Sequence, residues 1–171
     1  MKYDNARAQI KSGDLLAWSH RGWSSWYDIK VQAVRIWQRS RYSHVATAYV
    51  GMNRVWVIEA VMPEIRMIPL SNALPFDWVA MGAPWKPETE ERMIGLIGRP
   101  KDKAARYSQW QAVMGGMGKL KPGTDNLWMC AETAWYAAKL DGIDLGSKIY
   151  PSEIVQSAAL RPEGRIIPVE A

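Results

Sequence analysis

The stretches SHVATAYV (residues 43–50) and RVWVIEAV (residues 54–61) decide the fold of this chain. Both are rich in β-branched and aromatic residues, and the first also alternates in polarity, which is typical of β-strands. Only Gly51-Met52-Asn53 lies between them, and so short a loop is typical of a hairpin. We therefore predict an antiparallel pair of strands over residues 43–61.

The first strand of this hairpin carries a histidine among small side chains. Because successive side chains of a strand point to opposite faces, His44, Ala46 and Ala48 are predicted to share one face. Small residues beside the histidine leave room for close packing, so we expect a helix against that face.

Further elements extend outward from the hairpin in an order that predicts an α+β fold, with strands first and helices later. A Gly-Asp turn leads into a short strand ending at Trp18, and later strands are predicted at Ile65–Leu70 and Phe76–Met81. Helices are predicted at Trp26–Arg39, from Pro87 to Gly98, at Ala104–Met114, at Cys130–Leu140 and from Pro151 onward. No internal repeat or low-complexity linker interrupts the pattern, so residues 1–171 are interpreted as a single domain.

The composition limits the class of protein. Hydrophobic residues make up 48% and charged residues 23% of the 171 residues, which is typical of a globular protein. No apolar run is long enough to cross a bilayer, and no signal sequence is visible at the N-terminus. We therefore expect a protein without a transmembrane segment that is cytoplasmic as synthesised, with a phage virion or lysis protein as one candidate source.

The net charge is +5, and the isoelectric point is near 9.4. This charge favours anionic partners, including acidic lipid and cell-wall polymer. The basic residues are scattered rather than gathered into a dense run, so we expect no specific nucleic-acid partner. The sequence does not determine the oligomeric state.

The single cysteine, Cys130, is predicted to begin a helix, because turn-forming residues precede it and CAETAWYAAKL follows. Unpaired backbone N–H groups and the helix dipole at such a position stabilise a thiolate, and they also stabilise the oxyanion formed when a thiolate attacks a carbonyl. A buried structural thiol is the alternative. One cysteine excludes an internal disulfide and a cysteine-based zinc site, and we expect neither a metal nor a cofactor.

His44 and Glu59 are the other candidates for chemistry. A carboxylate between Ile58 and Ala60 in an apolar strand is costly without a partner, and a neighbouring imidazole is a natural one. We predict that Glu59 holds His44, and that His44 acts as the base for Cys130. The alternatives are a core histidine and a solvent-facing glutamate.

Four short motifs in this order carry a resemblance to a known family: SGDLLAW, YSHVATAYV, VIEAV and MCAETAW. Together they resemble the permuted branch of the NlpC/P60 cysteine-peptidase superfamily, in its YiiX/YebB-like form. The resemblance implies a circularly permuted papain-like fold, in which the cysteine-bearing helix packs on an antiparallel sheet.

The resemblance also implies roles for individual residues. Cys130 corresponds to the family's nucleophile, His44 to its base and Glu59 to its third polar residue. Glu132 matches the family's motif after the cysteine and is interpreted as a structural or capping charge. Tyr107 is a candidate helper near the oxyanion, although an insertion separates it from the family's Gly-x-Pro segment.

The expected function is therefore a cysteine hydrolase that cleaves an amide or ester bond, with cell-wall peptide as a candidate substrate for an amidase or endopeptidase. Two alternatives stay open. The first is a lipid-directed acyltransferase or thioesterase, and the second is a catalytically silent binding protein on the same fold.

Overall fold

A computed structural model describes residues 1–19, 41–61, 63–97, 106–107 and 127–171 of the chain. The helix predicted at Trp26–Arg39 lies outside these residues. Within the described residues, none of the helices has the length and apolar character that crossing a membrane requires.

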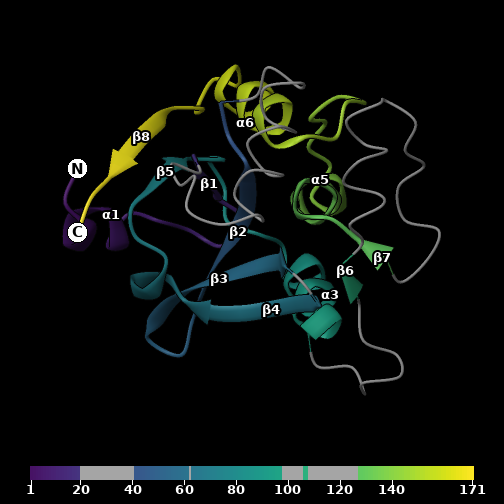
Figure 1. Cartoon of the computed structure of the whole chain (residues 1–171), viewed down its shortest axis with the longest axis horizontal. Coiled ribbons are helices and arrows are strands. Elements are labelled where there is room, and N and C mark those ends of the chain that lie inside the picture. Colours follow the sequence, from purple (N-terminus) through teal and green to yellow (C-terminus); the bar gives the residue numbers. More distant parts are fainter. Residues whose placement is uncertain (20–40, 62, 98–105, 108–126) are drawn as a thin grey trace, which may run out of the picture.

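The described strands form one sheet in the order β7-β6-β4-β3-β2-β1-β5-β8 (Figure 1). Its neighbouring strands are antiparallel, except for the short parallel pair β6 and β7. The bounds are β1 Leu15–Trp18, β2 His44–Gly51, β3 Arg54–Val61, β4 Glu64–Pro69, β5 Phe76–Val79, β6 Arg106–Tyr107, β7 Leu127–Trp128 and β8 Ile166–Val169.

The predicted hairpin is confirmed as β2 and β3, with Gly51 paired to Arg54. Its two-residue turn is formed by Met52 and Asn53, which have φ angles of 54° and 58°. Positive φ at both central residues matches the right-handed twist of the flanking strands. Asparagine adopts this conformation readily, whereas methionine rarely does.

The helix predicted at Ala104–Met114 is wrong for its described residues. Arg106 and Tyr107 form strand β6, in which Arg106 pairs with Glu64 of β4 and with Leu127 of β7. Pairing to a sheet edge overrides local helix propensity here, because the tertiary contact satisfies the backbone groups that a helix would otherwise satisfy. The remaining residues of that prediction lie outside the described ranges.

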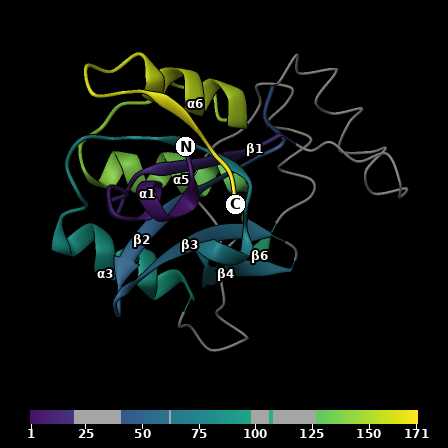
Figure 2. The ribbon, with the colours of Figure 1, turned by 90° about the vertical axis from the view of Figure 1, so that its left-hand side faces the viewer.

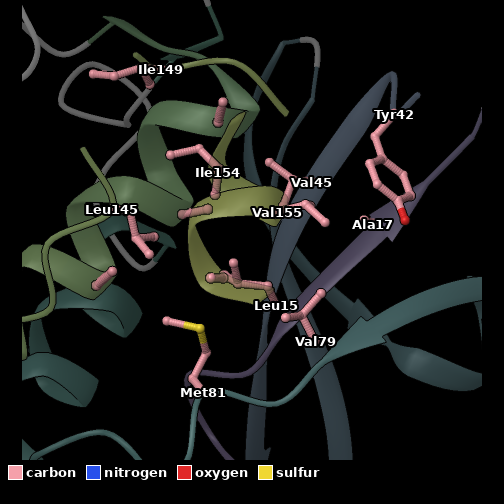
Figure 3. Close-up of a cluster of buried hydrophobic side chains, with 14 of the residues drawn as sticks. Leu15, Ala17, Tyr42, Val45, Val79, Met81, Leu145, Ile149, Ile154 and Val155 are labelled. Atoms are coloured by element: carbon pink, nitrogen blue, oxygen red, sulfur yellow. The ribbon is translucent and has the colours of Figure 1, made fainter. Parts of the chain in front are cut away.

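Two helices, α5 (Cys130–Leu140) and α6 (Pro151–Ala159), pack on one face of the sheet. Their predicted positions are confirmed. Figure 3 shows Ile154 and Val155 of α6 facing Leu15, Val45 and Val79 of the strands. Helix α3 (Pro87–Ile97) adds Met93 and Leu96 to an adjacent cluster that includes Ile58, Ala60 and Ala137.

The sheet curls around a second core on its other face. Val57 of β3 and Val169 of β8 belong to this same cluster, although three strands lie between them in the sheet. Ala6 of helix α1 (Tyr3–Arg7) also contributes to it. Ala46 and Ala48 belong to this second core. The cysteine-bearing helix α5 packs instead on the opposite face of the sheet, against Val45. The expectation that this helix would cover the face of Ala46 and Ala48 is therefore wrong.

The two ends of the chain lie close together, as both views show (Figures 1 and 2). Lys2 forms a parallel bridge with Glu170, and the terminal amine of Met1 donates to the Pro168 carbonyl at 2.7 Å. Strand β8 and helix α1, which the sequence analysis did not predict, are joined by these contacts.

Asp14 of the Gly-Asp turn joins β1 to β5. Asp14 is 1% exposed, and its carboxylate accepts three hydrogen bonds: from the backbone N–H of Lys11 at 2.9 Å, from that of Met81 at 2.8 Å and from the Trp78 indole at 2.9 Å. Burial raises the pKa of Asp14, while these three donors act in the opposite direction. The turn therefore has an architectural role, because its carboxylate ties β1 to β5.

Replacing Asp14 by alanine should destabilise the fold strongly, because two buried donors and one part-buried donor lose their acceptor. Each unsatisfied buried group costs about 1–3 kcal/mol, so we expect a loss of about 3 kcal/mol or more in the free energy of unfolding, measured by urea denaturation. Asp144→Ala is the matched control. Within the described residues, the exposed Asp144 carboxylate accepts a single local bond, from the Gly146 N–H, and its loss should cost less than about 1 kcal/mol. Equal losses for the two variants would contradict the assigned role.

Candidate active site

Cys130 is the first residue of α5, as predicted. Met129 precedes it with extended backbone angles and makes no side-chain capping hydrogen bond. The N–H groups of the first helical turn are therefore not capped by the side chain of the preceding residue. Cys130 is 8% exposed, so its sulfur is at the helix N-terminus but largely shielded from water.

His44 begins β2 and lies opposite Trp18 of β1. The two rings are in contact, with centroids 5.4 Å apart and planes inclined by 41°. The histidine side chain is 22% exposed. The indole limits the positions open to the imidazole from the β1 side, because Trp18 is itself anchored by its N–H to the Ala73 carbonyl at 2.6 Å.

The sulfur of Cys130 lies beside a stretch of β2 that is not paired with β3. The pairing of these strands starts only at Thr47 opposite Ile58, three residues after β2 begins. The N–H of Ala48 donates toward β1, to Asp14, so the alternation of a strand directs the N–H of Val45 away from β1. That N–H donates to the sulfur of Cys130, as does the N–H of Ala131.

Cys130 and His44 form a hydrogen-bonded pair whose proton affinities shift in opposite directions. Burial disfavours the charged imidazolium, but hydrogen bonds and charges from Cys130 and Glu59 outweigh it and raise the pKa of His44 to about 9. Burial also disfavours the thiolate, but the His44 hydrogen bond and charge, with the two backbone N–H groups, lower the pKa of Cys130. These shifts favour a thiolate–imidazolium ion pair at neutral pH.

Glu59 lies on the other side of the imidazole. Its Oε2 is 2.7 Å from His44 Nε2, and its side chain is only 7% exposed. Because Nε2 is occupied by this carboxylate, Nδ1 is the ring nitrogen left for the sulfur. Burial raises the pKa of Glu59, but hydrogen bonds and positive charge from His44 and Arg66 outweigh it and lower that pKa.

Arg66 is a site residue that the sequence analysis missed. It pairs directly with Glu59 across β3 and β4 and places two nitrogens on Oε1, with Nε at 2.8 Å and Nη2 at 2.7 Å. The signal in the sequence was the tight connection between β3 and β4, where Val61 pairs with Glu64. Counting outward from that pair puts Glu59 opposite Arg66, and opposite charges at facing positions attract.

Two further predicted residues have different outcomes. Tyr107 lies in β6 and pairs with Trp128, which is two residues before Cys130 in the chain. The side chain of Tyr107 is outside the described part of the structure. Its oxyanion role stays a prediction. Glu132 is buried in the first turn of α5, at 2% exposure, where a negative charge is favoured by the helix dipole.

No three His, Cys, Asp or Glu side chains are grouped to hold a metal ion in the part of the chain that the structure describes. Glu59, the carboxylate nearest His44, is already divided between the imidazole and a guanidinium. The arrangement brings the side chains of a cysteine, a histidine and a buried glutamate into contact, and the pKa shifts favour a thiolate and an imidazolium. Such a set can attack an acyl carbon and transfer a proton to the leaving group.

Comparisons with known proteins bear on the fold. No protein-family model and no curated protein matches the chain. Among solved structures, it is similar to metalloprotein yiiX from Escherichia coli O157:H7, with a TM-score of 0.53 at 15% sequence identity. The match covers 93% of this chain and 97% of that one. The word metalloprotein describes that protein, and what the likeness shows is that this chain has a yiiX-like α+β fold.

Proposed function

We propose that this protein is a cysteine hydrolase that cleaves an amide or ester bond, with Cys130 as nucleophile, His44 as acid and base, and Glu59 as the group that orients His44. The observation that carries the proposal is the contact of all three side chains at the start of α5 and β2. A structural thiol has no need of an imidazole, a carboxylate and two backbone N–H donors.

The reaction would proceed through a thioester. The Cys130 thiolate attacks the acyl carbon, forming a C–S bond, and the carbonyl electron pair moves to oxygen, where N–H groups at the start of α5 stabilise the charge. The oxyanion collapses, the bond to the leaving group breaks, and His44 transfers its proton to that group. Neutral His44 then takes a proton from water, which attacks the thioester and releases the acid and the thiolate.

We further propose that the fold is the circularly permuted papain-like arrangement and that the substrate is a cell-wall peptide. The order of motifs supports the first part: histidine strand, glutamate strand, then cysteine helix. The net charge of +5 supports an anionic polymer as the surface on which the enzyme acts.

Turnover of acyl substrates tests the reaction class and its substrate together. Muropeptides should be hydrolysed by the wild-type protein, whereas Cys130→Ala should lose at least about 10³-fold in kcat/KM because no other nucleophile replaces the thiolate. Cleavage of lipid esters in place of muropeptides would move the function to the lipid-directed class. Turnover of neither, or equal turnover by Cys130→Ala, would contradict the proposed hydrolase.

Alkylation of Cys130 tests activation of the thiol without any substrate. Since the chain has one cysteine, iodoacetamide labelling reports on Cys130 alone. At mildly acidic pH the thiol should react about tenfold or more faster than free glutathione, because its pKa is lowered. His44→Ala should remove this advantage. A wild-type rate no higher than that of glutathione would show that the cysteine is not activated.

Glu59→Gln should move the alkaline limb of the pH–rate profile. The Glu59 carboxylate helps to raise the pKa of His44 to about 9, so kcat/KM should fall as pH rises through that value and His44 loses its proton. A neutral amide stabilises the imidazolium less, and the limb should move downward by about one pH unit. A profile unchanged from that of the wild type would exclude Glu59 as the partner of His44.

A further inference from the structure

The contact between Arg66 and Glu59 differs from an ordinary surface ion pair. Nε and Nη2 of Arg66 both contact Oε1 of Glu59, at 2.8 Å and 2.7 Å. The other oxygen, Oε2, is left for His44 Nε2 at 2.7 Å. Each carboxylate oxygen thus has its own partner, and this division fixes the rotation of the carboxylate about its last bond.

The burial of the two partners is unequal. The Glu59 side chain is 7% exposed, whereas that of Arg66 is 53% exposed. A guanidinium so exposed gains little stability from an ion pair. The carboxylate, by contrast, is removed from water and requires charge and hydrogen bonds to remain ionised. The chief effect of the contact is therefore on Glu59, through both its charge and its orientation.

The strand geometry makes this contact rigid. Glu59 and Arg66 are directly opposed in the β3–β4 ladder, which is continuous from Trp56 opposite Pro69 to Val61 opposite Glu64. At Glu59, β3 is no longer paired with β2, because the pairing of these two strands extends from Gly51 opposite Arg54 only as far as Thr47 opposite Ile58. Beside the unpaired stretch of β2, the backbone of Glu59 is therefore held by pairing with β4 and not by pairing with β2.

We propose that Arg66 is a positioning residue of this site, which acts by holding the Glu59 carboxylate ionised and aimed at His44. The inference deepens the proposed function and rests on it, because it gives Arg66 a part in the same reaction. Arg66 has no direct contact with the nucleophile in this role. It acts through Glu59, and Glu59 acts on the imidazole.

The role has a consequence at acidic pH. Among the described residues, the Glu59 carboxylate contacts two cationic partners, His44 on β2 and Arg66 on β4. His44 in turn contacts Cys130 on α5. Without the guanidinium, Glu59 takes up a proton at a higher pH, because one of its two cations is gone. A protonated Glu59 supports the imidazolium less, so the thiolate also becomes protonated at a higher pH.

Arg66→Gln tests the inference, with Arg54→Gln as the matched control. Arg54 is an exposed arginine at the opposite end of β3, where it pairs with Gly51 of β2. Its substitution therefore removes the same charge from the sheet without touching Glu59. The pH dependence of Cys130 alkylation and a ¹³C NMR titration of the Glu59 carboxyl are the two measurements. In Arg66→Gln, both acidic transitions should move upward by about one pH unit relative to Arg54→Gln.

The outcomes separate this inference from the proposed function. Slow alkylation of the wild-type protein refutes the proposed function itself. Fast alkylation of the wild type, with the same acidic transitions in Arg66→Gln and Arg54→Gln, overturns the role of Arg66 alone. If Arg66→Gln does not fold, Arg66→Lys against Arg54→Lys replaces it. Lysine keeps the charge but loses the two-point contact, so a smaller upward shift supports the role and no shift overturns it.

Discussion

The packing of α5 across the start of β2 is the constraint on which the candidate site depends. It places the sulfur of Cys130 where β2 and β3 have not yet paired, so that the Val45 N–H is directed at sulfur rather than at a strand carbonyl. The same gap lets Glu59 reach from β3 to the ring of His44. If β2 and β3 were paired all the way to the start of β2, a strand carbonyl would accept the Val45 N–H, and the thiol would lose one of its donors.

Charge and burial then reinforce each other around this gap. A thiolate, an imidazolium, a carboxylate and a guanidinium alternate in sign from α5 through β2 and β3 to β4. Each of the inner charges has an opposite charge as its neighbour, which compensates for the loss of water. Only Arg66 at the end of the series is substantially exposed, and the exposed end of such a series loses the least hydration.

Much of the fold followed from local pattern. The β2–β3 hairpin, the start of α5 at Cys130 and the start of α6 at Pro151 were predictable, because alternation, turn residues and capping positions act over a few neighbouring residues. The short strand β6 was not, since only its pairing with Glu64 makes Arg106 extended. The face covered by α5 was also mispredicted. Side-chain size around His44 suggested the Ala46 side, yet the helix packs at Val45, and His44 meets Cys130 from the end of its strand.

The sequence by itself determined which groups could do chemistry: one cysteine at a helix start, one histidine at a strand start, and one glutamate in an apolar strand. Their residue types and order are local properties. Only the tertiary structure decided that the three meet, that Arg66 holds the far oxygen of Glu59, and that Val45 donates its N–H to the sulfur. These contacts depend on where strand pairing stops and how a helix crosses the sheet, and both result from packing between segments far apart in the chain.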